Sequence, residues 1–169
     1  MFLFFGWWLL MATCIDTFNT NLILNASYLE YNHRFIDYVS HAICPYYPQG
    51  NDWLHEKIFN SDASNRWVLT TGLENGTVGG FAILKNDCSE KKICTLYVSP
   101  DYRGLGIGAD LLNRSLQFLN CEKPLISVSD DLVMQFLPLF SHYSFKCEES
   151  YFGKYRAGHT EYSFNGILV

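Results

Sequence analysis

Hydrophobic and polar positions along the chain alternate with the periods expected of helices and strands. Between residues 22 and 43 a short apolar run precedes side chains that recur at helical spacing: Tyr28, Tyr31, Phe35, Tyr38 and Val39. Residues 44–50 include two prolines and a glycine, which cannot continue that helix. A second short helix is predicted from Asp52, a residue type that favours the N-cap, to Phe59.

Three strands are predicted in the middle of the chain. Residues 66–71 are rich in strand-forming side chains, and residues 77–84 form another apolar run. The sequence Glu74-Asn75-Gly76 between them is a hairpin signal. Residues 92–98 form the third strand, reached through a polar turn at residues 85–90. The three strands are therefore expected to pair with one another in antiparallel fashion through two short turns.

The second half of the chain reads as helix, strand, helix and two strands. A helix is predicted over residues 105–119, with one apolar face: Leu105, Ala109, Leu112, Leu116 and Leu119. Residues 125–128 fit a buried strand, and a helix near residues 131–140 precedes strands at 145–151 and 160–166. This order predicts an α/β (mixed α+β) fold. Its central mixed sheet has six or seven strands, one parallel right-handed βαβ crossover and about four flanking helices.

Length and composition fit one globular domain. The chain has 169 residues, of which 49% are apolar and 17% charged. Residues 1–18 are set apart as a hydrophobic N-terminal extension, and residues 19–169 form the predicted single domain. The uncharged stretch 1–15 is shorter than a spanning helix. It is read as a packed extension, as residues upstream of a start at Met11, or as a signal or membrane anchor.

Charge and cysteine content narrow the classes of partner. The formal charge is −5, and the 12 lysines and arginines form no run longer than two. Nucleic-acid binding is therefore not expected, whereas a cationic substrate such as an amine fits. The six cysteines form no C-x-x-C pair, so neither a zinc site nor a redox motif is indicated, and we expect no metal. Reduced thiols favour a cytoplasmic location, with membrane association through residues 1–15 as the alternative.

The segment Arg103-Gly104-Leu105-Gly106-Ile107-Gly108 carries the chemistry. It joins the strand ending at Val98 to the following helix, and its alternate glycines permit positive φ angles and a close approach to a ligand. Successive N–H groups and the helix dipole then favour a phosphate. The spacing does not fit the dinucleotide fingerprint, and a Walker-type G-K-S/T is absent. A purely structural turn is the other reading.

Together with its context, V-x-P-x-Y-R-G-x-G-I-G, this segment resembles the coenzyme A signature of the GNAT superfamily of N-acetyltransferases. The resemblance covers residues 78 to about 145. It implies that acetyl-coenzyme A (acetyl-CoA) is the co-substrate, with its thioester in a cleft between two splayed parallel strands. The residues that it assigns to the cofactor are Leu96, Tyr97, Val98, Arg103, Gly104, Leu105, Gly106, Ile107, Gly108 and Ala109.

The resemblance further implies direct attack of an amine on the thioester, assisted by a general acid and a base. The tyrosine that serves as general acid in this family aligns with Phe140, which has no hydroxyl group and cannot donate a proton. A kink at Pro138 would let Tyr143 take its place. Candidates for the base are Glu56, Glu90, His55, His142 and Tyr97, of which Glu56 is carried forward with Tyr143 as a catalytic prediction.

Tyr46, Tyr47 and Trp53, close to Asp52 and Glu56 in the sequence, are predicted to bind a cationic acceptor through their π faces. An ordinary aromatic core is the alternative for these three side chains. The predicted activity is acetyl transfer to a primary amine of a small molecule or protein. A non-catalytic acetyl-CoA-binding or interaction module on the same fold is the alternative function, and the sequence leaves a homodimer open.

Overall fold

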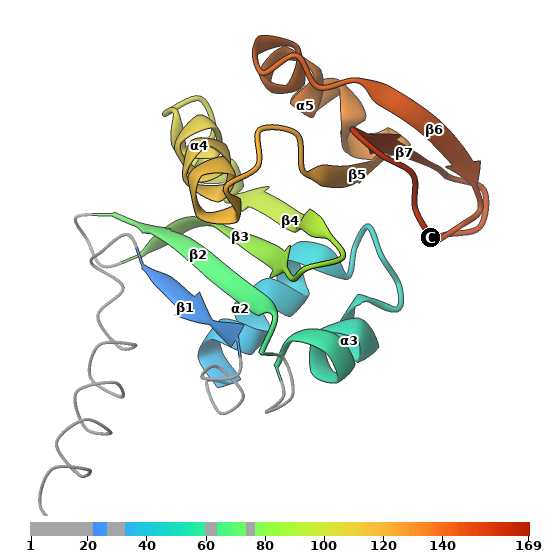
Figure 1. Cartoon of the computed structure of the whole chain (residues 1–169). Helices are drawn as coiled ribbons and strands as arrows, with labels where there is room; N and C mark the ends of the chain where they lie inside the picture. Colours follow the sequence, from blue (N-terminus) through green and yellow to red (C-terminus); the bar gives the residue numbers. More distant parts are fainter. Residues whose placement is uncertain (1–21, 27–32, 60–63, 74–76) are drawn as a thin grey trace, which may run out of the picture.

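The computed structural model describes residues 22–26, 33–59, 64–73 and 77–169 of the chain. Its strands form one sheet in the order β1-β2-β3-β4-β5-β7-β6 (Figure 1). The strands are β1 (Ile23–Asn25), β2 (Arg66–Gly72), β3 (Val78–Asn86), β4 (Lys91–Val98), β5 (Leu125–Ser129), β6 (Cys147–Phe152) and β7 (Thr160–Phe164). The helices are α2 (His33–Ile43), α3 (Gly50–Trp53), α4 (Ile107–Leu119) and α5 (Asp130–His142), with a π-helical turn η2 (Leu54–Ile58) and a 3-10 turn η3 (Pro100–Tyr102).

The sheet is mixed, with a single parallel pair among the described strands. β1 to β4 run antiparallel to their neighbours, β4 and β5 are parallel, and β7 is antiparallel to both β5 and β6. Helix α4 forms the crossover between the parallel strands, as the order of elements predicted. β7 inserts between β5 and β6, so the last strand of the chain lies next to the site-bearing part of the sheet.

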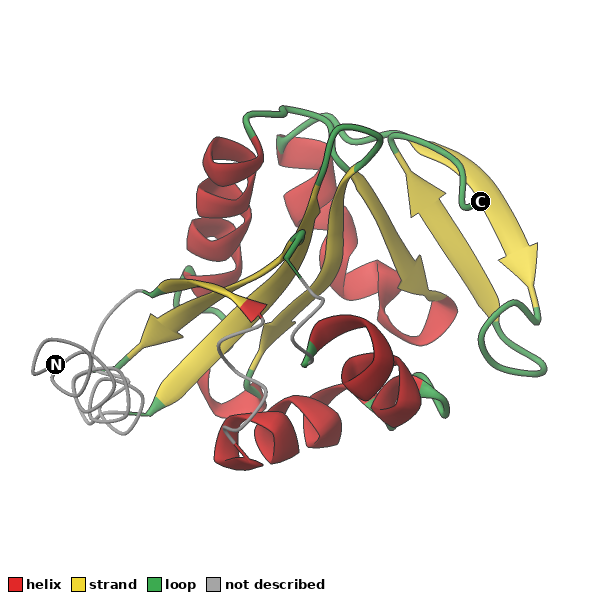
Figure 2. Ribbon diagram, turned by 60° about the horizontal axis from the view of Figure 1, so that its bottom comes forward, coloured by secondary structure: helices red, strands yellow, loops and turns green. Residues whose placement is uncertain are grey.

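Helices cover both faces of the sheet (Figure 2). On one face α2, α3 and η2 bury apolar side chains against β2 and β3, among them Phe35, Leu54 and Phe81. On the other face α4 and α5 pack on the sheet through residues such as Leu111 and Phe140. The alternation of side chains along each strand therefore supplies two separate cores, one on each face.

Strand β4 carries a β-bulge. Ile83 of β3 pairs with Thr95, whereas the next residue, Leu84, pairs with Ile93, so Cys94 is the extra residue. A bulge of this kind bends a strand and breaks its regular pairing on both sides. It lies directly after Ile93, the last residue of β4 that pairs with β5. The bulge and the separation of the two parallel strands therefore coincide.

Several expected boundaries are corrected by the structure. Helix α4 begins at Ile107, because Gly106 adopts φ +82° at its N-cap, and Leu105 is 68% exposed outside the helix. Its buried residues are Ile107, Leu111, Leu112, Ser115 and Leu119, so Ala109 does not belong to the core face. The helix expected over residues 52–59 is split into α3 and η2. Pro138 lies inside α5, which continues to His142.

Some predictions fall on residues that are not described. These are the extension 1–18, the helical positions Tyr28 and Tyr31, and the hairpin signal at residues 74–76. Among the described residues, no helix is long and apolar enough to cross a membrane.

Candidate functional site

The β4–β5 cleft opens where the two parallel strands separate. They pair only at Lys92 with Leu125 and at Ile93 with Ile126, although β4 continues to Val98. The cleft has a volume of about 410 Å³. Its walls come from β4, β5, α5, the α2–α3 loop and the glycine-rich turn. The lining includes Leu96, Tyr97, Val98, Arg103, Gly104, Ile107, Gly108, Ser127, Leu132, Gln135, Phe136 and Leu139.

The turn before α4 presents free backbone donors. Gly104 and Gly106 adopt φ values of +80° and +82°, and a Cβ atom at either position would meet nothing within 4 Å. No side chain caps α4, and the Asp110 N–H is the first in the helix to donate to a backbone carbonyl, that of Gly106. The amides of residues 107–109 are therefore orphan donors at the positive end of the helix dipole. This geometry suits a phosphate group.

Side chains around the turn leave that end of the cleft open to an anion. The carboxylate of Asp110 accepts hydrogen bonds from Thr71 Oγ1 and Arg114 Nη1, both at 3.4 Å. Asp110 therefore faces β2 and does not line the cleft. The guanidinium of Arg103 reaches across the cleft instead, donating to the Val98 carbonyl at 3.2 Å and to Gln135 Oε1 at 3.3 Å.

Backbone direction along β4 identifies the amides that face β5. The Ser99 N–H donates to the Gly79 carbonyl of β3 at 3.0 Å. Because donors alternate between the two neighbours of a strand, the N–H of Tyr97 also points to β3 and those of Leu96 and Val98 point into the cleft. These two amides lie just beyond the bulge, where the strand has no partner on that side.

A second cavity, the α3 pocket, lies on the sheet face that α2 and α3 cover. It has a volume of about 570 Å³ and shares Ile43, Tyr47, Cys94, Thr95 and Ser127 with the cleft. The remaining lining is strongly polar: Gln49, Asp52, Glu56, Arg66, Lys85, Glu90, Lys92, Tyr155 and Glu161, with Gly50 and Trp53. The two cavities therefore meet along the bulged part of β4.

Glu161 is the buried ionisable side chain at this junction. The residue is 3% exposed, and the Tyr47 hydroxyl lies 3.3 and 3.4 Å from its two carboxylate oxygens. Burial raises the pKa of the Glu161 carboxyl, against hydrogen bonds from Ser127 and Tyr47 and the charge of Lys92. Burial also raises the pKa of the Tyr47 phenol far above its ordinary value. Tyr47 is therefore a fixed donor, while Glu161 can exchange a proton.

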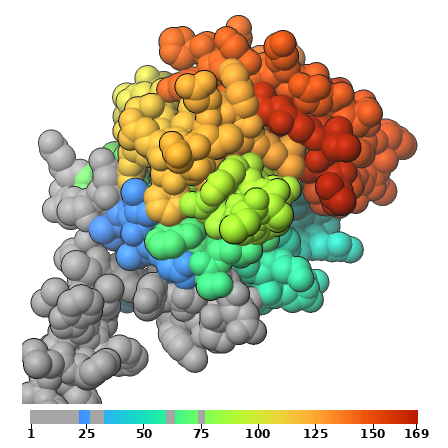
Figure 3. All heavy atoms as spheres, viewed as in Figure 1, coloured from blue at the N-terminus to red at the C-terminus, as the bar shows by residue number. Residues whose placement is uncertain are grey.

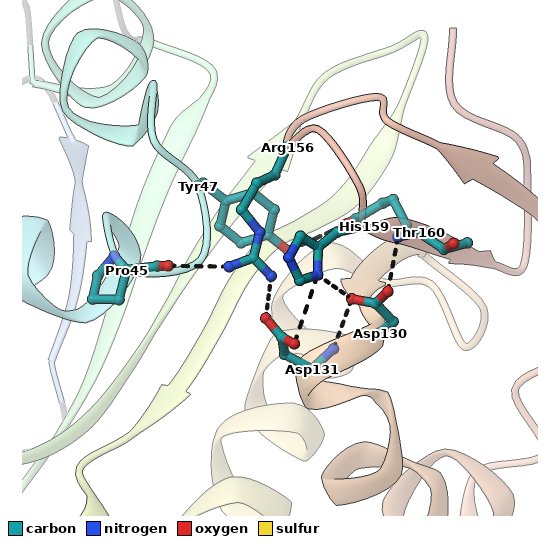
Figure 4. Close-up of polar contacts among 8 residues, drawn as sticks. Pro45, Tyr47, Asp130, Asp131, Arg156, His159 and Thr160 are labelled. Atoms are coloured by element: carbon teal, nitrogen blue, oxygen red, sulfur yellow. Dashed lines mark hydrogen bonds and ion pairs between the residues drawn. The ribbon is translucent and has the colours of Figure 1, made fainter.

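A polar network holds the loops beside Tyr47 in place (Figure 4). Arg156 donates to the carboxylate of Asp131 and to the Pro45 carbonyl, which joins the β6–β7 turn to α5 and to the α2–α3 loop. Asp130 accepts from the Thr160 amide at 3.0 Å and contacts His159 Nδ1 at 2.9 Å. The network fixes the start of β7, and Glu161 is the second residue of that strand.

Asp130, Asp131 and His159 also place three potential metal-ligand atoms within 4.8 Å of one another. Both carboxylates already accept hydrogen bonds from protein N–H groups, and Asp131 is paired with Arg156. These contacts describe an ion-pair network that joins three segments of the chain.

The structure brings several of the predicted residues together. Tyr46 and Tyr47 line the β4–β5 cleft, and Tyr47, Trp53 and Glu56 line the α3 pocket. In the space-filling view these cyan and teal segments lie below the orange and red C-terminal part of the chain (Figure 3). Leu105 lies in the glycine-rich turn and Ala109 in the first helical turn of α4, and neither residue lines the cleft.

Tyr143 does not line either cavity. It follows the last residue of α5, contacts His142 and Phe145 through its ring, and its carbonyl accepts from Lys123. Phe140 is 1% exposed and packs on Phe136, Phe145 and Phe164. The helix presents apolar residues and Gln135 to the cleft in this region, and it presents no hydroxyl.

Sequence reasoning missed Glu161, Arg66 and Lys92. The alternation Thr160-Glu161-Tyr162-Ser163-Phe164 places Glu161 on the face opposite Tyr162 and Phe164, and a charged residue there was a usable signal. The proximity of Glu161 to Tyr47 was not accessible, because 114 residues separate them.

Comparison with known proteins agrees with this geometry. Residues 28–129, more than half of the chain, match the family model described as "Acetyltransferase (GNAT) family". No curated protein sequence matches the chain.

Solved structures that resemble the chain include a GNAT-family protein from Desulfovibrio desulfuricans. It is 14% identical, with a TM-score of 0.62, and the alignment covers 79% of this chain and 91% of that one. A spermidine/spermine N-acetyltransferase from Vibrio cholerae is 13% identical, with a TM-score of 0.58 and coverage of 86% and 92%. A protein related to streptothricin acetyltransferases, from Bacillus anthracis and in complex with acetyl coenzyme A, is 18% identical, with a TM-score of 0.51 and coverage of 59% and 61%. At these identities the likeness establishes the fold.

Proposed function

The chain belongs to the acetyltransferase (GNAT) family, and from that premise we propose that it transfers an acetyl group from acetyl-CoA to a primary amine in a ternary complex. The observation that carries the proposal is the β4–β5 cleft. It joins a phosphate-binding turn at one end to a polar pocket with a buried carboxylate at the other. Such a channel positions a cofactor and an acceptor on either side of one reacting centre.

The residues of the cleft fit acetyl-CoA. Orphan amides of residues 107–109 and the two positive-φ glycines would bind the pyrophosphate, with Arg103 beside them. Leu132, Phe136 and Leu139 give the cleft an apolar wall for the pantetheine arm. The cofactor supplies an acetyl group already activated as a thioester. The amides of Leu96 and Val98 would donate to its carbonyl oxygen as negative charge develops there.

Glu161 is the group that we assign to the amine. An ammonium is not nucleophilic, so the protein must accept one proton before the nitrogen–carbon bond forms and the carbon–sulfur bond breaks. The buried carboxylate of Glu161, with its raised pKa, lies at the junction of the two cavities, and Tyr47 and Ser127 orient it. Glu56 lines the same pocket from an exposed position, which suits attraction of a cationic amine.

Calorimetric titration with acetyl-CoA tests the proposal at the cofactor site. Gly106→Glu puts a carboxylate beside the orphan amides, so saturable micromolar binding by the wild type should be lost. Gly153→Glu is the matched control, because Gly153 has φ +72° in the β6–β7 turn and its Cβ would also meet nothing within 4 Å. Both variants carry similar backbone strain, and only the first affects the cleft.

Release of free thiol from acetyl-CoA with a panel of primary amines tests the transfer itself. Turnover above the rate without protein supports the enzyme. Saturable binding with no thiol release from any amine would favour a non-catalytic acetyl-CoA-binding module. If the wild type does not bind acetyl-CoA, the glycine-rich turn is structural and the proposed function is wrong.

A further inference from the structure

Three basic side chains form a row across the sheet floor of the α3 pocket. The strand register pairs Arg66 of β2 with Lys85 of β3, and Lys85 with Lys92 of β4. Paired residues on adjacent strands point to the same face. That face is the one covered by α2, because Val68 and Ile83, two positions from Arg66 and Lys85, belong to the core beneath this helix. All three basic residues line the pocket.

Among the described residues, only the middle member of the row has a carboxylate at ion-pair distance. Lys85 Nζ lies 2.8 Å from Glu90 Oε2 and 3.4 Å from Asp87 Oδ2. Within the described parts of the chain, neither Arg66 nor Lys92 has a carboxylate at ion-pair distance. In the part of the chain that the structure describes, the row therefore has two basic side chains without an ion pair, one on either side of a paired lysine.

The guanidinium of Arg66 has unused donors. Its Nε and Nη1 atoms are buried, and in the described structure they have no hydrogen-bond partner. Buried N–H groups are normally satisfied, and an unpaired one on a charged group costs free energy. The planar fork of an arginine matches the two oxygens of a carboxylate. Burial raises the pKa of the Cys94 thiol, and the positive charges of Arg66 and Lys92 act against that rise.

This basic row is separate from the phosphate-binding turn. Lys92 lies near the start of β4 and the turn follows its end, six residues further on, which is about 20 Å along a strand. The anionic groups of acetyl-CoA bound at the turn therefore leave Arg66 and Lys92 free. Glu161 lines the α3 pocket beside Tyr47, which lines both the pocket and the cleft.

We propose that the α3 pocket selects an acceptor that carries a carboxylate as well as the reacting amine. Arg66 and Lys92 bind the carboxylate, and the amine lies at the Glu161 end. Arg66 and Glu161 stand on strands that three others separate, so the two groups of the ligand lie at opposite ends of an extended chain, as in an ω-amino carboxylate. Asp52 and Glu56 line the same pocket from α3 and η2, on exposed residues. The proposal rests on the proposed function.

The test compares 6-aminohexanoate with its amide, which lacks only the negative charge, and with the polyamine spermidine. For the wild type, kcat/KM should be roughly tenfold to a hundredfold higher for the carboxylate than for the amide, as expected of charge-assisted hydrogen bonds. Arg66→Gln and Lys92→Gln should remove this preference and leave the KM for acetyl-CoA unchanged. Lys57→Gln is the control, because Lys57 is exposed on η2 and does not line the pocket.

A wild type that prefers the amide or spermidine would overturn the proposal, as would variants that keep the preference for the carboxylate. Should Arg66→Gln fail to fold, Lys92→Gln gives the same comparison from a surface-accessible position. Calorimetric titration of 6-aminohexanoate into the protein separates the proposal from the proposed function. Binding that Lys92→Gln abolishes supports the subsite even where no acetyl-CoA is bound, and absence of binding to the wild type overturns it.

Discussion

The hydroxyl of Tyr47 lies 3.3 and 3.4 Å from the two carboxylate oxygens of Glu161, a contact between residues 114 positions apart in the chain. It links the α2–α3 loop to β7 at the point where the two cavities meet. The contact explains how a buried carboxylate is oriented in a site whose other walls carry apolar, acidic and basic side chains. The fold therefore brings a distant tyrosine to the carboxylate that is proposed as the general base.

Glu161→Gln should lower kcat for acetyl transfer by about 10²- to 10⁴-fold, the usual contribution of a general base. The amide has nearly the same shape, so the KM for acetyl-CoA should stay close to that of the wild type. Steady-state thiol release with a saturating amine measures both quantities. Glu149→Gln on the exposed strand β6 is the control, because its side chain lies outside both cavities. A Glu161→Gln variant of normal kcat would exclude Glu161 as the base.

The same substitution should change how folding stability depends on pH. The pKa of Glu161 is raised in the folded protein, so the folded state binds this proton more tightly than the unfolded chain. Its contribution to the free energy of unfolding is fully present below the unfolded pKa of about 4.3, and it is lost as pH rises through the folded pKa. Glutamine does not ionise. Glu161→Gln should therefore gain stability relative to the wild type from acid to neutral pH, by about 1.4 kcal/mol for each pKa unit of the shift.

Urea unfolding at a series of pH values measures this difference. Glu149→Gln, at an exposed position on β6, is the control for the substitution itself. A constant difference for Glu161→Gln would mean that the Glu161 carboxyl titrates alike in the folded and unfolded protein.

Gly80→Ala should destabilise the fold by about 1–3 kcal/mol, the usual cost of overpacking. A Cβ at Gly80 would lie 2.6 Å from the Tyr97 carbonyl oxygen and 3.1 Å from side-chain atoms of Ile107 and Leu111. β3, β4 and α4 meet closely there, immediately behind the cleft. Gly108→Ala is the contrast, because its Cβ meets only Val98 Cγ2 at 3.6 Å, and alanine favours a helix. Thermal unfolding of the pair should separate them, and equal melting temperatures would contradict the argument.

Tyr143→Phe should change kcat by no more than about twofold, whereas loss of a general acid costs about 10²-fold or more. Tyr143 is outside the lining of both cavities, and its ring packs beside His142 and Phe145. Tyr46→Phe, which removes a hydroxyl that does line the cleft, is the comparison under the same conditions. A large loss of kcat in Tyr143→Phe would show that this residue reaches the thiolate after all.

Local sequence patterns were sufficient for the crossover and its turn. The glycines at 104 and 106 and the apolar period of α4 act within a few residues, so their effect does not depend on the rest of the fold. Leu105 was placed wrongly on the helix face, because periodicity alone does not reveal that Gly106 delays the first turn.

The acceptor side of the site depends on strand order and register instead. Arg66 and Lys92 share a floor because of how β2, β3 and β4 pair, and Glu161 lines the same pocket because β7 inserts beside β5. The role of Phe140 was also out of reach of local sequence patterns. Its alignment with the family's tyrosine suggested a missing acid, and the structure shows a core residue that is 1% exposed. Pairings between distant segments decide such positions, and no local pattern encodes them.

Asp130 should make folding stability depend on pH in the direction opposite to Glu161. Hydrogen bonds from the Thr160 amide and from His159 lower the pKa of its carboxyl. Its contribution is therefore present above the unfolded pKa of about 3.9 and is lost as pH falls through the folded pKa. The difference in unfolding free energy between the wild type and Asp130→Asn should be largest near neutral pH and close as the solution is acidified. Asp37→Asn, at an exposed position on α2, is the control for the substitution itself. If the difference for Asp130→Asn instead persists into acid, the contacts that Asp130 makes with Thr160 and His159 do not depend on the charge of its carboxyl group.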